Sequence, residues 1–397
     1  MADLAAGITL DGGFLKFIWR NETAPVGRVP IHVNEDLLKK AAKGARARLG
    51  ELTDFSVEIS RAGIDLATNL AKKNECRSLL YELACAGQSI HKQLFTDMKG
   101  RDKEASSTRA KIDQEVAGSR LAIWTDCFCH VPWGVVYSKK APLPLASADP
   151  TNPSDYAEFW GMKFRLAAVF KRGEIITDGH PLGNLKMLTV LNQSTFNDAL
   201  SRLPSTRQER LTSRIGRLPH GSVSNSNDTK SIWPQTFNDH CLLFFYCHAN
   251  GTRLELGPTD TINVLEFEEL FDRPSAEESG KFCLTFLNGC STAVGEGSEA
   301  FQAATMAPGF CGFIGTEERV PDAFALEFAE DLLEYIDEQQ VPLIDAMYLM
   351  RSQYWPLSLL YGVYADPALR TGVAPTGTKS GVAPPTNVLT SSGHKSL

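Results

Sequence analysis

Short apolar runs alternate with segments of helical periodicity from residue 186 onward, and this alternation constrains the fold more than any other feature of the chain. The runs have few polar interruptions, which is typical of strands buried on both faces, and they fall within 186–192, 241–250, 281–290 and 310–316. Helical segments lie between and after them and end with an amphipathic helix over 321–340 and a last helix over 342–355. This spacing predicts an α/β fold, with a largely parallel sheet and helices on both of its faces.

The first part of the chain is predicted to form a small appendage to that sheet. Residues 8–33 carry short extended pieces punctuated by glycine and proline. Asn34 is placed to cap a helix whose first turn is acidic and whose later turns are basic, so both ends complement the helix dipole. We therefore expect an extended and helical appendage at 1–75 and the main domain at 76–370.

Four shorter stretches complete the prediction. Residues 120–137 suggest a strand, a tight turn and a second apolar run, and 159–170 fits either a strand or a short helix. Ser194 is the expected N-cap of a helix over 194–203. Residues 204–238 are polar and first basic, so they are expected to form a long loop that governs access or activation.

Composition narrows the classes of function. The 397 residues include 40 Lys and Arg against 47 Asp and Glu, a net charge of −7 that argues against a general nucleic-acid binder. No stretch approaches the roughly 18 uncharged apolar residues of a membrane span, and the N-terminus lacks the features of a signal peptide. We expect a cytoplasmic protein with no membrane partner, and a disordered tail at 371–397, which has almost no large apolar residues.

The nine cysteines favour a reducing compartment. Their number is odd, no CxxC is present, and a chain of this length has no need of a disulfide framework. Motifs for phosphate loops, dinucleotide binding and zinc proteases are also missing from the sequence, and the histidines and cysteines lack metal-ligand spacing. The sequence therefore predicts no cofactor and no metal.

Two of the predicted strands end in residues with nucleophilic or proton-transfer chemistry. One is followed by His248 and the other by Cys290, 42 residues later, which leaves room for one crossover helix. Because ligand sites gather at the carboxyl ends of parallel strands, both side chains are expected at one sheet edge. A nearby histidine can stabilise a thiolate nucleophile. Taken singly, each residue is more often structural, and a free cysteine is usually a buried core residue.

At these residues the chain resembles the CHAT domain, a caspase-like cysteine peptidase related to separase. The resemblance covers roughly residues 80–370 and is carried by YCHANG, LTFLNGCSTA, FIGTEERVPDAFA, LLYGVYADPALR and, upstream, WTDCFCHVPWGVVY. It implies a caspase-like sheet and a dyad in which Cys290 attacks the scissile carbonyl and His248 shuttles the proton. The amides of Ala249 and Cys290 would correspond to the oxyanion donors.

Substrate-pocket candidates follow from the same strand ends. They are Asp126, Asn288, Glu317 and Asp322, and for each acidic one a solvated or helix-capping role is at least as frequent. Related enzymes that cut after basic residues often carry an acid two residues before the cysteine. Asn288 occupies that position here, so the sequence gives no support for a basic P1 residue.

The predicted function is that of a cysteine endopeptidase acting on a protein or peptide substrate. The family resemblance implies regulated proteolysis in cell-death or antiviral defence systems, a gasdermin-like pore former as substrate and an activating partner protein. The alternative is a catalytically degenerate member that serves as a protein-interaction scaffold.

Overall fold

The structure of the protein is a computed structural model. It describes residues 4–11, 14–21, 31–96, 102–125, 131–138, 148–170, 187–216, 222–236, 242–271, 283–294, 300–305, 310–365 and 369. The tail expected at 371–397 lies outside the described residues.

The C-terminal half forms a six-stranded sheet in the order β14-β13-β12-β8-β6-β7. All neighbouring strands run parallel except β14, which is antiparallel to β13. The bounds are β6(Met187–Leu191), β7(Ser222–Val223), β8(Leu242–Tyr246), β12(Cys283–Asn288), β13(Phe310–Thr316) and β14(Tyr361–Ala365). The predicted α/β fold with a largely parallel sheet is confirmed.

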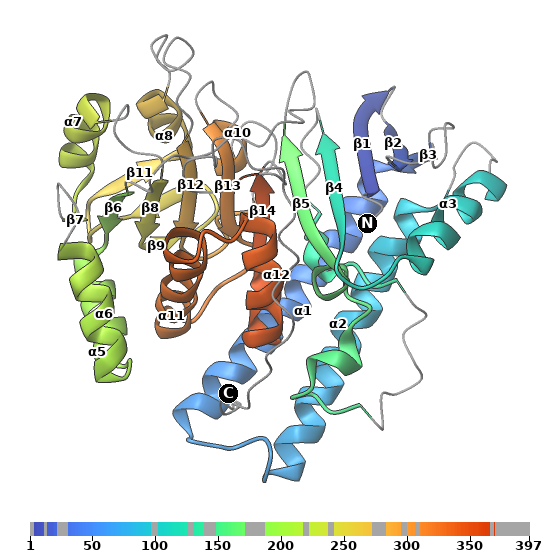
Figure 1. The fold of residues 1–397 in the computed structure, drawn as a ribbon, viewed down its shortest axis with the longest axis horizontal. Coiled ribbons are helices and arrows are strands. Elements are labelled where there is room, and N and C mark those ends of the chain that lie inside the picture. Colours follow the sequence, from blue (N-terminus) through green and yellow to red (C-terminus); the bar gives the residue numbers. More distant parts are fainter. Residues whose placement is uncertain are drawn as a thin grey trace.

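Helices cover both faces of this sheet. Successive side chains of β8 point to opposite faces, so the helices that they contact can be placed on one face or the other. Phe245 contacts Phe267 of α8(Val264–Phe271), and Phe267 in turn contacts Phe301 of α10(Phe301–Ala304). The adjacent Tyr246 points the other way and contacts Phe196. That second face carries α5(Gln193–Ser201), α11(Asp322–Leu333), the π-helical turn η5(Glu334–Glu338) and α12(Leu343–Gln353) (Figure 1).

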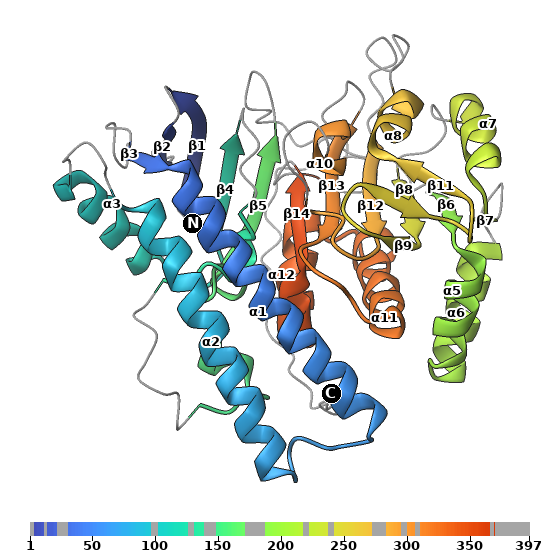
Figure 2. The ribbon, with the colours of Figure 1, turned by 180° about the vertical axis from the view of Figure 1, so that it is seen from behind.

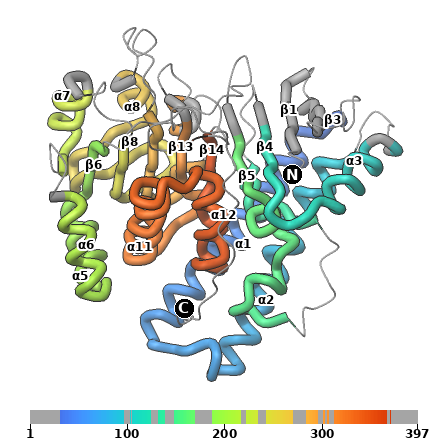
Figure 3. The backbone as a smooth tube through the Cα atoms, in the orientation of Figure 1, coloured from blue at the N-terminus to red at the C-terminus, as the bar shows by residue number. Residues whose placement is uncertain are grey.

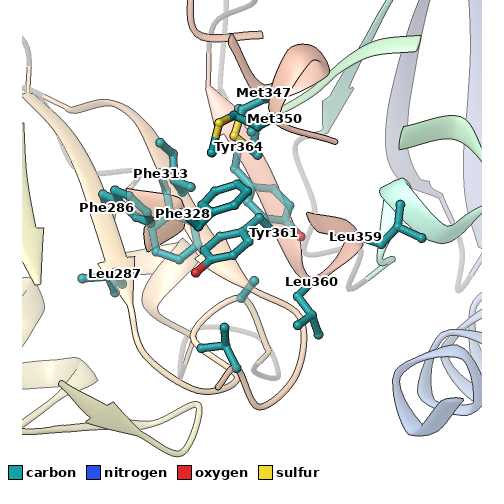
Figure 4. Close-up of a cluster of buried hydrophobic side chains, with 14 of the residues drawn as sticks. Phe286, Leu287, Phe313, Phe328, Met347, Met350, Leu359, Leu360, Tyr361 and Tyr364 are labelled. Atoms are coloured by element: carbon teal, nitrogen blue, oxygen red, sulfur yellow. The ribbon is translucent and has the colours of Figure 1, made fainter. Parts of the chain in front are cut away.

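The core under α11 and α12 is aromatic and sulfur-rich (Figure 4). Phe328 of α11 stacks on Tyr361 of β14, with ring centroids 3.9 Å apart. Phe286 of β12 meets Tyr361 edge-on, and Met347 and Met350 of α12 are buried in the same cluster. The turn η6(Leu357–Leu360) leads directly into β14. Because Tyr361 begins β14 at the site described below, this packing fixes one wall of that site.

A second sheet has five strands in the order β3-β2-β1-β4-β5. Strand β1 pairs parallel with β4, and β4 with β5, whereas β2 and β3 are antiparallel neighbours. The bounds are β1(Leu4–Asp11), β2(Phe14–Asn21), β3(Ile31–Asn34), β4(Ser119–Thr125) and β5(Phe164–Phe170). Strands from both sides of the boundary proposed at residue 75 therefore share one sheet.

Two long helices lie in the chain between β3 and β4 of that sheet. Asn34 caps α1(Glu35–Arg61), as predicted, by accepting a hydrogen bond from the Leu37 amide. The helix then continues well beyond the basic segment because its buried face persists to Ile59. It packs against α2(Leu70–Leu94), within which residue 75 lies, and α3(Asp102–Gln114) follows.

The two sheets stand edge to edge. Strand β14 of one lies beside β5 of the other, although nearly 200 residues separate them in sequence (Figures 1 and 3). Seen from behind, α1 runs obliquely across the region where the sheets meet (Figure 2). This position brings an N-terminal helix close to the C-terminal sheet.

The prediction of a long loop at 204–238 is wrong. Its described part contains α6(Ser205–Gly216), β7 and α7(Ser226–Thr236). The basic residues that suggested a solvated loop lie on α6, where Arg207 is buried against acidic residues of α11. Ion pairs add to the contacts of its two apolar residues, Leu211 and Ile215, in holding α6 in place.

Three local predictions also change. Asn192, rather than Ser194, caps α5 by accepting a hydrogen bond from the Thr195 amide. The second apolar run predicted within 120–137 forms the 3₁₀ turn η1(Trp133–Val135), and the turn η2(Pro153–Tyr156) follows later. The stretch 159–170 holds both alternatives, α4(Trp160–Lys163) and then β5.

Candidate active site

Strands β8 and β12 are parallel neighbours, as the strand-end pattern predicts. Their register pairs Tyr246 with Asn288, the last residue of each strand. His248 and Cys290 each lie two residues further along. The two residues therefore leave adjacent strands at the same level, at the carboxyl edge where parallel sheets place their ligands.

Glycines allow the two turns to approach closely. A Cβ at position 289 would lie 2.6 Å from the Cys247 carbonyl oxygen and 3.1 Å from the Ala249 Cβ. Gly251 has φ +87°, and a Cβ there would lie 2.9 Å from the Val294 carbonyl oxygen. The turn that carries His248 thus packs backbone to backbone against the turn that carries Cys290.

The Cys290 turn has an unusual backbone. Ser291 adopts φ 56°, a left-handed conformation that costs a residue with a side chain about 1–2 kcal/mol. Its amide donates to the Glu318 carbonyl oxygen at 3.2 Å, and the Ala293 amide donates to the Thr316 carbonyl oxygen at 2.8 Å. Within the described residues, the Cys290 amide donates no hydrogen bond. It is therefore free to bind an incoming oxygen.

The thiol of Cys290 is half-buried. Its Sγ lies 3.9 Å from the Val320 carbonyl oxygen. Burial raises the pKa of this thiol, and the negative charges of Asp322 and Glu318 act in the same direction, whereas the Val320 contact and the Arg319 guanidinium oppose the rise. In this conformation the group is a neutral thiol at neutral pH.

His248 is exposed and begins the short strand β9(His248–Ala249). In a small three-stranded sheet, β9 pairs with β10(Arg253–Glu255), which pairs with β11(Thr261–Asn263). This register places Glu255 opposite His248 and Leu254 opposite Ala249. The hydrogen-bond partner of the Cys290 thiol here is Val320, not His248. The structure thus brings the two backbones together, and no hydrogen bond joins the side chains of His248 and Cys290.

Asn288 lies beneath the site and is buried. Its Nδ2 donates to the Ala325 carbonyl oxygen at 2.8 Å, and its Oδ1 accepts from the Tyr361 hydroxyl at 2.7 Å. The side chain thereby connects the end of β12 to α11 and β14. Both ends of its amide are engaged by the protein.

Glu317 lies just after β13, and its side chain is 3% exposed. Its Oε2 accepts from Arg46 Nη2 at 2.9 Å, and its carboxylate also accepts from the Tyr364 hydroxyl. Burial raises the pKa of Glu317, and the guanidinium charge of Arg46 counteracts the rise. This carboxylate holds α1 against the sheet.

The remaining two pocket candidates differ in position. Asp322 is half-buried at the start of α11, close enough to Cys290 to act on the thiol pKa, and its carbonyl oxygen accepts from the Tyr246 hydroxyl at 2.8 Å. Asp126 lies outside the described residues. Of the three candidates that the structure describes, Asp322 combines proximity to the thiol with partial exposure to solvent.

The loop 317–320, between β13 and α11, contributes to the site through its backbone, whereas the sequence predicted only the Glu317 side chain as part of the site. It supplies the carbonyl oxygens of Glu318 and Val320 that contact the Cys290 turn. The sequence does carry a signal for it, because β13 is the strand that follows Cys290 and its end should reach the same sheet edge. Only the backbone participates, however, and backbone contacts leave no residue-type pattern.

The described cysteines outside this turn are free thiols: Cys76, Cys85, Cys247 and Cys283. Among the described residues, no group of three or more His, Cys, Asp or Glu side chains could hold a metal ion.

In the same part of the chain, every helix is too short or too polar to cross a membrane.

Comparison with family models and with curated proteins gives no match to this sequence. Among solved structures, the fold is similar to Saccharomyces cerevisiae separase in its complex with securin, with a TM-score of 0.50 and 12% identity over 92% of this chain. This chain spans only 30% of the length of that separase chain. Gingipain R, the Arg-specific cysteine proteinase RgpB, matches with a TM-score of 0.42 and 12% identity, over 67% of this chain and 68% of its own.

The likeness to separase, which covers 92% of this chain, supports the fold assignment. It agrees with the mostly parallel sheet and with helices on both faces. The chain has a caspase-like α/β fold.

Proposed function

We propose that the protein is a cysteine endopeptidase in which Cys290 is the nucleophile and His248 the general base and acid. The observation that supports this most is the register of β8 and β12, which sets both residues two positions beyond paired strand ends. The glycines at 289 and 251 then bring the two turns into contact. A nucleophile beside a base is the arrangement by which acyl transfer is commonly catalysed, on this and on unrelated folds.

The reaction divides into two halves. His248 takes the proton of the Cys290 thiol, and Sγ attacks the scissile carbonyl carbon to form a tetrahedral oxyanion. The amides of Cys290 and Ala249 stabilise that oxyanion. The C–N bond then breaks, His248 gives its proton to the departing amine, and water hydrolyses the thioester with His248 again acting as the base.

This mechanism requires a change at the thiol when substrate binds. In the free protein Sγ faces the Val320 carbonyl oxygen and His248 is exposed. Catalytic hydrogen bonds are often formed only in the complex with substrate. Movement of His248 toward the thiol on binding would favour the thiolate, since a cation nearby lowers a thiol pKa.

We infer the biological setting from the resemblance to the CHAT domain. It favours regulated proteolysis of a protein substrate in a reducing compartment, the cytoplasm, within a cell-death or antiviral defence system. A gasdermin-like pore former is the proposed substrate. An activating partner protein would control the enzyme, by analogy with separase, which crystallised with its protein partner securin.

Substitution of the nucleophile tests the proposal. In a digest of a peptide library, Cys290→Ala should abolish cleavage, and His248→Ala should reduce it by at least about a hundredfold. Cys85→Ala is a matched control, because Cys85 is also a half-buried free thiol but lies on α2. A Cys290→Ala variant that keeps wild-type cleavage would refute the assignment.

A scaffold without catalysis is the second candidate. It is favoured by the neutral thiol, which contacts the Val320 carbonyl oxygen rather than the histidine. A peptidyl ketone electrophile separates the two functions, because it must occupy the substrate site before it alkylates. An enzyme should lose this labelling in His248→Ala, whereas a scaffold should label slowly and equally in both forms.

A further inference from the structure

One face of α1 lies against the loop that holds the Cys290 turn. Arg46, Gly50 and Asp54 are spaced four residues apart and therefore share a face of the helix. They meet three consecutive residues of the loop, Glu317, Glu318 and Arg319, in the same order. The helix and the loop thus contact one another over two helical turns.

The inner contact is a buried ion pair. Arg46 donates to Glu317 Oε2 from Nη2 at 2.9 Å and from Nε at 3.2 Å, and the two side chains are only 10% and 3% exposed. The Glu317 amide donates to the Leu360 carbonyl oxygen at 2.7 Å. These two charge-assisted hydrogen bonds hold the start of the loop against α1.

The middle contact is a close approach of backbone to side chain. A Cβ at position 50 would lie 3.4 Å from Glu318 Cγ, at ordinary contact distance, so only the longer side chain of a residue such as leucine would press on the Glu318 side chain. The outer contact is an ion pair between Asp54 and Arg319, both of which are exposed. The three contacts differ in burial, and each can be changed separately.

The opposite side of the same loop holds the nucleophile. The Glu318 carbonyl oxygen accepts from the Ser291 amide, which has the left-handed conformation, and the Val320 carbonyl oxygen faces the Cys290 thiol. Immediately before the loop, the Thr316 hydroxyl donates to the Gly289 carbonyl oxygen. The loop is therefore in contact with α1 on one side and with residues 289–291 on the other.

We propose that α1 is a positioning element for the nucleophile, with Arg46 as its principal positioning residue. The helix holds the loop 317–320, and the loop holds the Ser291 amide and the thiol in place. Displacement of α1 would release the Cys290 turn without any change at Cys290 or His248. The effect on turnover rests on the proposed peptidase function, whereas the effect on the turn itself does not.

Two leucine substitutions on α1 provide the test. Gly50→Leu inserts a side chain against Glu318, and Gly44→Leu places the same side chain on the same helix where nothing lies within 4 Å. Both replace a mid-helix glycine by a strong helix former, so α1 itself is favoured equally. The readouts are hydrogen exchange of the Ser291 amide, the rate of Cys290 alkylation by iodoacetamide, and kcat and KM for a cleaved peptide.

In Gly50→Leu we expect exchange at Ser291 and alkylation of Cys290 to become several-fold faster, because the loop no longer covers them. We expect kcat to fall about tenfold with KM little changed, because the nucleophile is misplaced. Gly44→Leu should match the wild type in every readout. If the wild type cleaves no peptide, the proposed function fails, and exchange and alkylation still decide the positioning role.

A second pair of variants tests the same proposal independently, in case Gly50→Leu does not fold. Asp54→Lys replaces the exposed attraction with repulsion toward Arg319 and should accelerate Ser291 exchange. The double variant Asp54→Lys with Arg319→Glu restores opposite charges and should return the exchange toward the wild-type rate. Equal Ser291 exchange and Cys290 alkylation in Gly50→Leu and Gly44→Leu, with no response to the charge changes, would overturn the proposal.

Discussion

Gly289 shows how a single residue determines the geometry of the candidate site. Because a Cβ there would lie 2.6 Å from a backbone oxygen of the neighbouring turn, Gly289→Ala must force the two turns apart. We expect a loss of roughly 1–3 kcal/mol in the free energy of unfolding, measured by denaturant titration, together with a drop in peptide cleavage.

Gly257→Ala is the control for that substitution. Its Cβ would lie 3.6 Å from the Asp260 Cβ, an ordinary contact. It should leave stability and cleavage close to those of the wild type. A Gly289→Ala protein as stable and active as Gly257→Ala would show that the close approach of the turns is unimportant.

A second prediction for a single residue concerns the pH dependence of alkylation at the Cys290 thiol. Its pKa is raised chiefly by burial. The thiolate, which is the reactive form, should therefore form only at a pH higher than the pH at which an ordinary cysteine ionises. The alkylation rate of the free protein should therefore rise with pH to a midpoint above that of an unstructured cysteine peptide. A midpoint at or below the peptide value, measured by mass spectrometry over a pH series, would contradict this.

The sequence allows prediction of some of these residues and not of others. The position of His248 and Cys290 just beyond neighbouring strand ends could be predicted, because each closely follows an apolar run and strand ends are visible in sequence. The left-handed conformation of Ser291 and the contact of the thiol with the Val320 carbonyl oxygen could not be predicted. Both are features of the backbone, and no particular residue type marks them in the sequence. Arg46 and Glu317 lie 271 positions apart, and a single sequence contains nothing that pairs them.

Among the elements, α6 departs most from expectation. Its helical residues face α11 through arginines, so it lacks the apolar stripe by which a helix is recognised. Arg207 contacts Glu330 and Asp331, each at 2.7 Å, and is 8% exposed. Because ion pairs hold α6 against α11, its sequence is basic and polar, and such a segment is easily mistaken for a solvated loop.

Removal of this arginine should destabilise the protein. Arg207→Met removes the guanidinium that Glu330 and Asp331 share. Glu330 keeps Arg210, and Asp331 keeps the Tyr354 hydroxyl and the Gln353 amide, so we expect a loss of up to about 3–5 kcal/mol. Thermal unfolding of Arg202→Met is the comparison, because Arg202 forms an exposed i,i+4 pair worth less than about 1 kcal/mol. Similar melting temperatures for the two variants would mean that α6 is held by its apolar contacts instead.

At the scale of the whole molecule, the N-terminal segment is part of the larger unit. Strand β1 pairs with β4, and α1 packs on α2 while it contacts the loop beside Cys290. The alternation in the second half was enough to predict its sheet. The way the first half joins it was not predictable, because contacts between distant segments leave no local periodicity.

Truncation provides the corresponding prediction. A protein that begins at residue 76 loses α1, β1 to β3 and the first turns of α2, so β4 has no partner on one side and α2 no covering helix. We expect it to be recovered as aggregate, or as a species without a cooperative thermal transition by circular dichroism. A soluble fragment with a sharp transition would establish 76–370 as an independent domain.

The edge-to-edge meeting of the two sheets also affects which strand edges remain open to other chains. Because β14 and β5 lie beside one another, the outer strands of the described array are β7, with two residues, and β3, with four. Long open strand edges recruit other chains, and short ones do so poorly. The joined sheets thus leave little backbone available for templated β-addition, although together they contain eleven strands.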